Sequence, residues 1–380
     1  MKLLIVDPYV TSSSPTMRGW VDSFDAVAEL FDTIEIWAIG CEVADHPKVR
    51  WLPVSTKLPG WKLKSIAYAR EVTRRLKRLD RKDTLVQVSG CLAPWTDIRY
   101  IQFWNKAFLE ERAKRTETLK LGFVTHLMTR WAARQEAAVL RDTGSTSYWW
   151  VVSRSLASTI ESHGAGGLFR LIPNQYNPQR FHPAVRDEWR ESSRQRYGFK
   201  PEEKVLVFSA FGHFERKGLL QGVQAVACLR AKGHAVRYLI LGGTDSTIRN
   251  FRNKLTSAEQ DACVFAGLVE NIERHLVAAD GMLFPSHFEA FSLAEIEAAA
   301  LGLRLYLTPH YGAEMILTDP ANGRWLPWDV GGMATILEEE VLTGRLGQTH
   351  HELGEALTAE DYRRRLRELY VEAIQSKARA

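Results

Sequence analysis

The chain has 380 residues, of which 45% are hydrophobic and 25% charged, and its formal net charge at pH 7 is +5. This length exceeds what one hydrophobic core usually serves, so we expect two domains of a soluble globular protein. No apolar run reaches the roughly 20 residues that a membrane-spanning helix needs. Four widely spaced cysteines without a C-x-x-C pair argue against a zinc site or a disulfide framework and suit a reducing cytoplasm.

Short apolar runs alternate with amphipathic stretches along the first half. The first run ends at Asp7 and is too short for a signal peptide, so we predict a β-strand there. The predicted strands of this half are Leu3–Asp7, Thr33–Ala38, Thr84–Val88, Tyr100–Trp104 and Tyr148–Val152. The predicted helices are Met17–Leu30, Leu63–Leu79 and Leu119–Arg141.

A basic segment extends over residues 46–82. Its twelve Lys and Arg residues are opposed only by Glu71 and Asp80, and tryptophans flank it. Such a face can dock on anionic lipid, where each basic residue contributes about 1 kcal/mol. A solvated helix face is the alternative, and nucleic acid is not expected because no nucleic-acid-binding motif accompanies the charges. The segment includes Trp51, Lys57, Trp61, Lys62, Lys64, Arg70, Arg74, Arg75, Lys77, Arg78, Arg81 and Lys82.

The clearest domain boundary is the segment 173–183, which contains three prolines and two asparagines. Such a segment does not continue a helix or a central strand. After it, the predicted strands are Lys204–Ala210, Val236–Leu241, Cys263–Ala266, Gly281–Phe284 and Arg304–Leu307, and the predicted helices are Leu219–Ala231, Asn271–Ala279 and Leu293–Leu301. This alternation of strands and helices predicts parallel sheets covered by helices on both faces.

The last helix begins with a capping box, Thr358-x-x-Asp361, and needs a surface to cover. Its predicted apolar positions are Tyr362, Leu366, Leu369, Tyr370 and Ala373. We therefore predict an N-terminal domain over 1–175, a C-terminal domain over 184–357 and a C-terminal helix over 358–380.

The segment 281–302 carries the most chemical information, and it predicts a buried strand, a tight turn and a helix. Ser292 is a natural N-cap with Glu295 at the third helical position, and Gly302 ends the helix. The helix dipole and the backbone amides at the helix start make a phosphate site. The amides concerned are those of Phe291, Ser292 and Leu293.

Two carboxylates lie beside this phosphate site, Glu289 in the loop before the helix and Glu297 in its second turn. Their E-x7-E spacing, with Pro285-Ser286 after an apolar strand, resembles the signature of retaining GT-B glycosyltransferases, in particular glycosyltransferase family 4. In that family the first glutamate contacts the donor sugar and the second contacts the nucleotide ribose. The resemblance thus implies a catalytic role for Glu289 and donor binding by Glu297. An accidental spacing on an acidic surface helix is the alternative.

The resemblance also implies the fold. It predicts an α/β protein with two Rossmann-like parallel-sheet domains facing a deep interdomain cleft. It further predicts that the C-terminal helix crosses back to the N-terminal domain.

A second element, residues 205–219, predicts a strand, a loop and a helix start. The family has a loop that ends in Lys-Gly, with an arginine five residues before the lysine. Lys217 matches that lysine, and the resemblance implies a catalytic role for it at the leaving diphosphate. Gly212 occupies the arginine position in the donor site, so Arg216 is the substitute that we consider. A solvated helix N-terminus is the alternative for both basic residues.

Other stretches match the family more loosely. Leu268 ends a stretch that, together with residues 239–243, resembles the walls of the donor base pocket. In the first half, Gly19 alone is left to contact the donor phosphates in place of the family's Gly-Gly loop. Asn105 stands where the family often has a catalytic histidine, and the nearest histidine is His126. Both are catalytic candidates on the acceptor side, although a histidine on a predicted helix is more often packed or exposed.

The resemblance implies a retaining hexosyltransferase that uses a UDP- or GDP-sugar. The acceptor would be a glycan or a lipid-linked molecule of bacterial surface polysaccharide, lipopolysaccharide or glycolipid synthesis. We expect no cofactor and no metal, because no D-x-D motif lies near either site. We expect a cytoplasmic protein, peripheral on the inner face of the cell membrane through residues 46–82. A nucleotide-sugar epimerase of the same fold and a non-catalytic basic module that binds membrane or nucleic acid are the alternatives.

Overall fold

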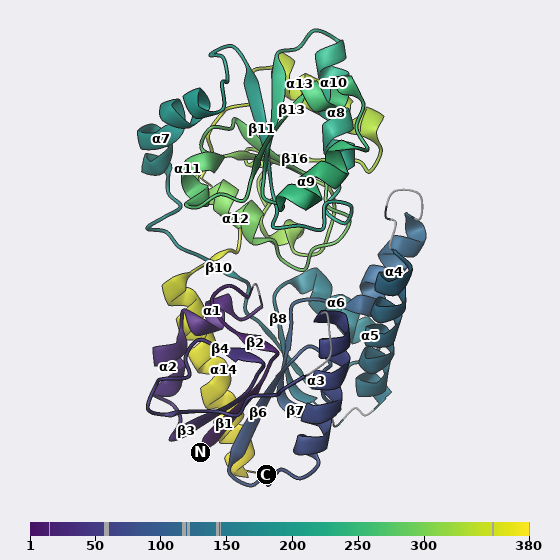
Figure 1. Cartoon of the computed structure of the whole chain (residues 1–380). Helices are drawn as coiled ribbons and strands as arrows, with labels where there is room; N and C mark the ends of the chain where they lie inside the picture. The colour runs from purple at the N-terminus through teal and green to yellow at the C-terminus, as the bar shows by residue number, and fades with distance from the viewer. Residues whose placement is uncertain are drawn as a thin grey trace. The chain divides into compact units, whose positions relative to one another are not determined.

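The computed structural model describes residues 1–14, 16–56, 61–115, 119, 122–141, 144, 146–351 and 353–379, and of residues 61 and 62 it describes the backbone alone. The chain divides into two compact units (Figure 1). Unit 1 comprises residues 1–110, 121–175 and 357–380, and unit 2 comprises residues 111–120 and 176–356. Unit 2 therefore includes residues 111–120, which the sequence placed in the N-terminal domain, and residues 176–183, which it assigned to the linker.

Unit 1 is built on a seven-stranded parallel sheet in the order β5-β3-β1-β6-β7-β8-β9. A short pair, β2 with β4, accompanies it. The strands are β1 (Lys2–Val6), β2 (Tyr9–Val10), β3 (Thr33–Trp37), β4 (Gly40–Cys41), β5 (Val49–Trp51), β6 (Thr84–Ser89), β7 (Thr96–Ile101), β8 (Thr146–Val151) and β9 (Leu168–Leu171). The helices are α1 (Arg18–Val21), α2 (Phe24–Ala28), α3 (Trp61–Leu76), α4 (Asn105–Lys114), α5 (Phe123–Arg141), α6 (Arg154–Ser162) and α14 (Ala359–Arg379).

The prediction of strand β7 was shifted along the chain. We predicted Tyr100–Trp104, whereas the strand is Thr96–Ile101, because a charged residue in its centre concealed it. Arg99 is fully buried, and its guanidinium donates hydrogen bonds to the Gly90 and Ala93 carbonyls and to Thr146 Oγ1. These hydrogen bonds compensate for burial at Nε and Nη1, whereas Nη2 is buried without a hydrogen-bond partner among the described residues.

Two helices of unit 1 also differ from the prediction. The stretch predicted as one helix over Met17–Leu30 forms the two short helices α1 and α2. The helix predicted from Leu119 begins at Phe123, and α4 precedes it, which the sequence did not predict. Residues 120 and 121 of that prediction lie outside the described residues, as do Lys57 and the side chains of Trp61 and Lys62 in the basic segment.

Helix α14 returns to unit 1, as predicted. It contacts α2 and β6, and Figure 1 shows it running along the sheet. All five predicted apolar positions are buried. Inside the core, Trp20 Nε1 donates to Tyr370 Oη at 2.7 Å, and Tyr370 Oη donates to Gln87 Oε1 at 2.5 Å. At the start of the helix, Asp361 N donates to Thr358 Oγ1 at 3.1 Å, which is one half of the predicted capping box.

Unit 2 is built on a six-stranded parallel sheet in the order β13-β12-β11-β14-β15-β16. Its strands are β11 (Lys204–Ser209), β12 (Val236–Leu241), β13 (Cys263–Gly267), β14 (Gly281–Phe284), β15 (Arg304–Leu307) and β16 (Gly323–Trp325). Its helices are α7 (Pro183–Arg196), α8 (Leu219–Ala231), α9 (Asp245–Arg252), α10 (Ser257–Asp261), α11 (Ile272–Leu276), α12 (Leu293–Ala300) and α13 (Val330–Leu342), with the 3₁₀ turn η1 (Ala313–Met315). Two linker strands, β10 (Gln175–Tyr176) and β17 (Leu357–Thr358), pair with each other.

Helix α7 is tied to the main sheet of unit 2 by three arginines on one face. Arg186, Arg190 and Arg194 are spaced four residues apart, so they project from the same side of the helix. Their guanidinium groups donate to the carbonyls of residues 278–279, and Arg190 Nη2 also donates to Asp280 Oδ1 at 2.7 Å. The helix is therefore fixed at the residues that lead into β14.

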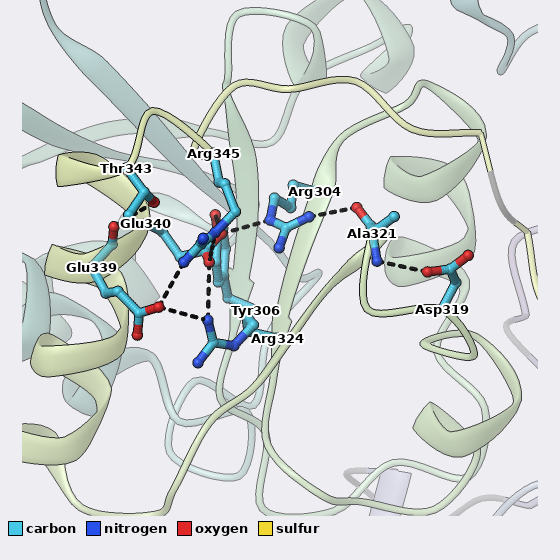
Figure 2. A network of polar contacts seen from close by, with 9 residues as sticks. All are labelled: Arg304, Tyr306, Asp319, Ala321, Arg324, Glu339, Glu340, Thr343 and Arg345. Carbon is cyan, nitrogen blue, oxygen red and sulfur yellow. Dashed lines mark hydrogen bonds and ion pairs between the residues drawn. The ribbon is translucent and has the colours of Figure 1, made fainter.

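A second polar network holds α13 against the last strands of unit 2 (Figure 2). The Glu340 side chain is fully buried and accepts hydrogen bonds from Arg304 Nε at 2.6 Å, Arg345 Nε at 2.8 Å and Arg324 Nη1 at 3.2 Å. Tyr306 Oη donates to the same carboxylate at 3.0 Å. One helix residue therefore joins side chains of β15 and β16.

Candidate active site

The candidate site lies where the strand order of unit 2 reverses. Strands β11 and β14 are neighbours in the sheet, but the chain continues from them toward opposite edges. In open parallel sheets, such a switch point at the carboxyl ends of the strands is where ligands bind. The loop 210–218 follows β11 and the turn 285–292 follows β14, so both loops lie at this edge.

The two loops touch at Gly218. This residue has φ of +68°, and a Cβ placed there would lie 1.9 Å from the carbonyl oxygen of Pro285. Only glycine allows this approach, which accounts for the Lys-Gly pair that the sequence presents. The contact brings Lys217 to the turn that carries Glu289.

The Glu289 carboxylate binds both basic residues of the loop. Its Oε1 accepts hydrogen bonds from Lys217 Nζ at 2.7 Å, Arg216 Nη1 at 2.9 Å and Ser286 Oγ at 3.3 Å. Arg216 Nη1 also donates to the carbonyl of Phe288. The structure thus brings together three of the residues that the sequence predicted, in one cluster of opposite charges.

Burial and charge act against each other in this cluster. Burial alone would raise the pKa of Glu289, but Arg216 and Lys217 outweigh it and hold that pKa at about 2. For Lys217, burial lowers the pKa more than Glu289 raises it. Glu289 is therefore ionised throughout the neutral pH range and acts as a hydrogen-bond acceptor there.

The start of α12 was predicted correctly in position but not in its capping. Ser292 is the N-cap residue, yet its side chain makes no capping hydrogen bond, so the predicted capping box is absent. Glu295 pairs instead with His310, at 2.9 Å between Oε1 and Nε2. Both side chains are fully buried, and a basic partner satisfies a buried carboxylate better than one backbone amide does.

The other predicted donor residues lie around this helix start. Phe291, Ser292 and Glu297 are buried, whereas Leu293 is partly exposed. His310 and Thr308 were not predicted, although a signal was present: they are polar residues just after the carboxyl end of β15, where parallel strands present their ligands.

A cavity of about 450 Å³ lies beside the predicted base pocket. Ala266 and Gly267 of β13 line it, together with residues of α9, whereas Leu268 is 51% exposed next to it. Gly242 N donates to the Gly267 carbonyl at 2.6 Å, which joins the ends of β12 and β13. At Gly212, an added Cβ would meet no atom within 4 Å, so the missing family arginine leaves open space.

The three predicted residues of unit 1 have separate surroundings. Gly19 packs on Tyr362, whose ring would lie 3.0 Å from an added Cβ. The Asn105 side chain donates to Glu136 Oε1 at 2.8 Å, and this carboxylate also accepts backbone amides at the start of α4. His126 lies half-buried on α5, and its Nδ1 is buried without a hydrogen-bond partner among the described residues.

The described residues contain neither a membrane-spanning helix nor a metal-binding cluster. None of the helices in those ranges has the length and hydropathy of a membrane-spanning segment. Within the same ranges, no three His, Cys, Asp or Glu side chains gather into a group that could hold a metal ion.

The chain is similar to known proteins in part of its sequence and in its fold. Residues 202–339 match the sequence model of the family described as Glycosyl transferases group 1. No curated protein sequence gives a significant match. WaaG, a glycosyltransferase involved in lipopolysaccharide biosynthesis, is structurally similar, with a TM-score of 0.69 and 18% identity over 99% of this chain and 98% of WaaG.

Two further structures resemble the whole chain. Sucrose-phosphate synthase from Thermosynechococcus elongatus gives a TM-score of 0.71 with 15% identity, covering 99% of each chain. HepE from Anabaena, in complex with UDP and glucose, gives a TM-score of 0.63 with 14% identity, covering 98% of this chain and 100% of HepE. These similarities confirm the predicted α/β fold of two Rossmann-like parallel-sheet domains, which is that of GT-B glycosyltransferases.

Proposed function

We propose that the chain is a retaining glycosyltransferase that moves a hexose from a UDP- or GDP-sugar to a glycan or lipid-linked acceptor. The observation that carries this proposal is the cluster of Lys217, Arg216 and Glu289 beside the start of α12. The family match over residues 202–339 spans the whole cluster. A HepE structure contains UDP-glucose, which supports a nucleotide sugar as the donor.

The cluster supplies the charges that a nucleotide sugar requires. Lys217 and Arg216 face the donor diphosphate, and the amides at the start of α12 complete its site. Glu289 accepts hydrogen bonds from the sugar hydroxyls, and Glu297 accepts them from the ribose. The acceptor oxygen bonds to the anomeric carbon as the bond from that carbon to the phosphate oxygen breaks. The acceptor proton is transferred to the departing diphosphate.

Preorganised positive charge is the main catalytic contribution in this mechanism. Lys217 and Arg216 stabilise the negative charge that develops on the leaving diphosphate, so the proposal requires no divalent metal. Unit 1 binds the acceptor. Because the Asn105 side chain is bonded to Glu136, His126 is the better acceptor-side candidate of the two.

WaaG is a glycosyltransferase involved in lipopolysaccharide biosynthesis. By analogy we place the reaction in the synthesis of bacterial surface polysaccharide, lipopolysaccharide or glycolipid, on the cytoplasmic side of the membrane.

Replacing Glu297 by Ala will lower the affinity for the donor by about 10- to 100-fold, because a charged hydrogen bond contributes about 1.5–3 kcal/mol. The measurement is the thermal shift of the purified protein with UDP, GDP and their common sugars. A ligand at 100 times its Kd stabilises the folded state by about 2.7 kcal/mol, so the matching donor will raise Tm in the wild type. Glu202→Ala, which removes an exposed acid before β11, is the control.

Two results of this experiment would count against the proposal. If no UDP or GDP ligand shifts the wild type, the donor site is wrong. Equal shifts in Glu297→Ala and the wild type would refute the ribose contact. Incubation of the bound sugar without acceptor then separates the alternatives, since an epimerase converts it and a transferase does not.

The exposed face of α3 supports docking on an anionic membrane. Leu63 is 48% exposed near the start of this helix, and basic residues continue along the same face. Among the described residues, the side chains of Arg70, Lys77 and Arg78 form no ion pair, so their charges are open to lipid phosphates. The exposed basic residues of this face and of the turn after it are Arg70, Arg74, Lys77, Arg78, Arg81 and Lys82.

Reversing three of these charges, in Arg70→Glu, Lys77→Glu and Arg78→Glu together, will weaken binding to anionic vesicles by about 100-fold or more. The estimate takes about 1 kcal/mol for each basic residue near the surface. Sedimentation with vesicles of phosphatidylcholine, with and without phosphatidylserine, measures it. The combination Arg196→Glu, Lys200→Glu and Arg363→Glu changes the net charge equally at exposed positions elsewhere. Equal pelleting of both triple variants would refute this docking face.

A further inference from the structure

The loop that follows β15 packs against the turn that carries Glu289. We define residues 308–312 as the brace loop. Thr308 Oγ1 donates to the carbonyl of Ser286 at 2.6 Å. At the other end of the loop, Gly312 has φ of +84°, and an added Cβ would lie 2.5 Å from the carbonyl oxygen of Ala290. The brace loop thus contacts the turn on both sides of Glu289.

Between these two contacts, the brace loop carries His310, which forms the buried pair with Glu295 of α12. The side chains of both residues are fully buried, and their contact at 2.9 Å joins the brace loop to the first turn of the helix. The other polar atoms of the pair, His310 Nδ1 and Glu295 Oε2, are buried without hydrogen-bond partners among the described residues. The Glu295 carboxylate therefore depends on His310 for compensation of its charge.

The charges of the His310–Glu295 pair also interact with charged residues of the donor site. Burial alone would lower the pKa of His310, but Glu295 outweighs it and raises that pKa above its ordinary value. Glu289 acts in the same direction as Glu295, and Lys217 opposes both. Lys217 in turn interacts with Glu295 and with Arg216. Glu289 and Lys217, the two charged groups that act on His310 besides its partner Glu295, thus belong to the proposed donor site.

The proton on His310 decides whether this group of side chains carries a net charge. Arg216 and Lys217 balance Glu289 and Glu295, so the group is neutral when His310 is neutral and carries one positive charge when His310 is protonated. A nucleoside diphosphate brings negative charge into a site of low dielectric constant, where a single charge has a large effect.

We propose that His310 and Glu295 are positioning residues of the donor site, and that the proton of this pair couples donor binding to pH. This inference depends on the proposed function, because it assigns the pair to the same diphosphate site. The charged pair fixes the first turn of α12 and the brace loop against the turn of Glu289, and it supplies the surplus positive charge. Neither residue touches the donor.

The sign of the pH dependence follows from the direction of the pKa shift. Because the pKa of His310 is raised in the folded protein, its charge is fully present below the ordinary histidine pKa and is lost as pH rises through the raised value. Donor affinity should therefore fall as the solution becomes alkaline. Above pH 7 the terminal phosphate of a nucleotide is already ionised, since its second pKa is about 6, so its own titration does not mask the effect.

The experiment measures the Kd of UDP, with GDP in parallel, by calorimetry from pH 7 to pH 9. In the wild type we expect the affinity for the nucleotide to fall about tenfold across this range, because His310 loses its proton and the site loses one positive charge. His310→Gln will bind more weakly at pH 7 and show no pH dependence. Glu295→Gln removes the main group that raises the pKa of His310, so it will also lose the pH dependence above pH 7, but it keeps one surplus positive charge from Arg216 and Lys217 over Glu289. The double variant will resemble Glu295→Gln rather than His310→Gln, because both lack the Glu295 charge and the effects of residues in contact are not additive.

Thr308→Val separates a structural role from the electrostatic one. It removes the neutral hydrogen bond to Ser286 and leaves His310 in place, so it will weaken binding but retain the wild-type pH dependence. The inference is overturned if His310→Gln keeps that dependence, or if the wild type shows none, a result that requires no variant to fold. If neither nucleotide binds the wild type at any pH, the proposed function itself fails.

Discussion

Replacing Lys217 by Ala will reduce the rate of sugar transfer by about 10²- to 10³-fold, the usual cost of removing one preorganised group that stabilises developing charge. The Lys217 ammonium is buried, and it lies 2.7 Å from Glu289 at the point where the diphosphate would bind. In the transition state the negative charge on the leaving oxygen grows, so the loss will be greater for kcat than for donor binding. The loss is measured as the steady-state rate of sugar transfer, with the donor that the thermal-shift experiment identifies.

Two companion variants make this result specific. Lys217→Arg keeps the charge but spreads it over a planar group, so it will recover only part of the activity. Lys254→Ala removes an exposed lysine of the same unit that pairs with Glu215 on the surface, and it will leave the rate unchanged. A Lys217→Ala rate within about threefold of the wild type would remove this residue from the mechanism.

Replacing Glu340 by Ala will lower the free energy of unfolding of unit 2 by about 3–5 kcal/mol, because it removes one partner of a buried charge network. Arg304 is only 5% exposed at its side chain and would lose the carboxylate that it contacts at 2.6 Å. Tyr306 Oη, also buried, would lose its acceptor. Figure 2 shows Arg304 and Tyr306 of β15, together with Arg324 of β16, around Glu340. Urea denaturation followed by circular dichroism measures the change.

The neighbouring acid provides a matched control. Glu339 also contacts Arg324 and Arg345, but its side chain is 49% exposed, so Glu339→Ala will cost about 1 kcal/mol or less. If the two variants lose equal stability, burial is not the reason for the effect of Glu340.

The contribution of Glu340 will also depend on pH. Burial alone would raise its pKa, but hydrogen bonds from Arg304 and Arg345 outweigh it and lower that pKa below the ordinary value of 4.5. The stabilisation is therefore fully present above the ordinary value and is lost as pH falls through the lowered one. The difference in the free energy of unfolding between the wild type and Glu340→Ala will therefore become smaller below about pH 4.5.

The sequence by itself determined those features that depend on local pattern. Helix α8 begins and ends where its apolar spacing placed it, and strands β12, β14 and β15 have their predicted bounds. Lys217, Glu289 and Glu297 were chosen for a spacing that resembles a known family, and the first two meet in the structure. Such features can be predicted from the sequence alone because periodicity, turn residues and short motifs are properties of neighbouring positions.

The tertiary structure decided what depends on partners distant along the chain. Arg99 lay outside the predicted strand Tyr100–Trp104, yet hydrogen bonds to the Gly90 and Ala93 carbonyls hold it inside strand β7. Glu295 read as half of a capping box, until the fold placed His310, fifteen positions later, against it. A charged side chain in an apolar stretch is costly unless it is compensated, and only the folded chain supplies the compensating group.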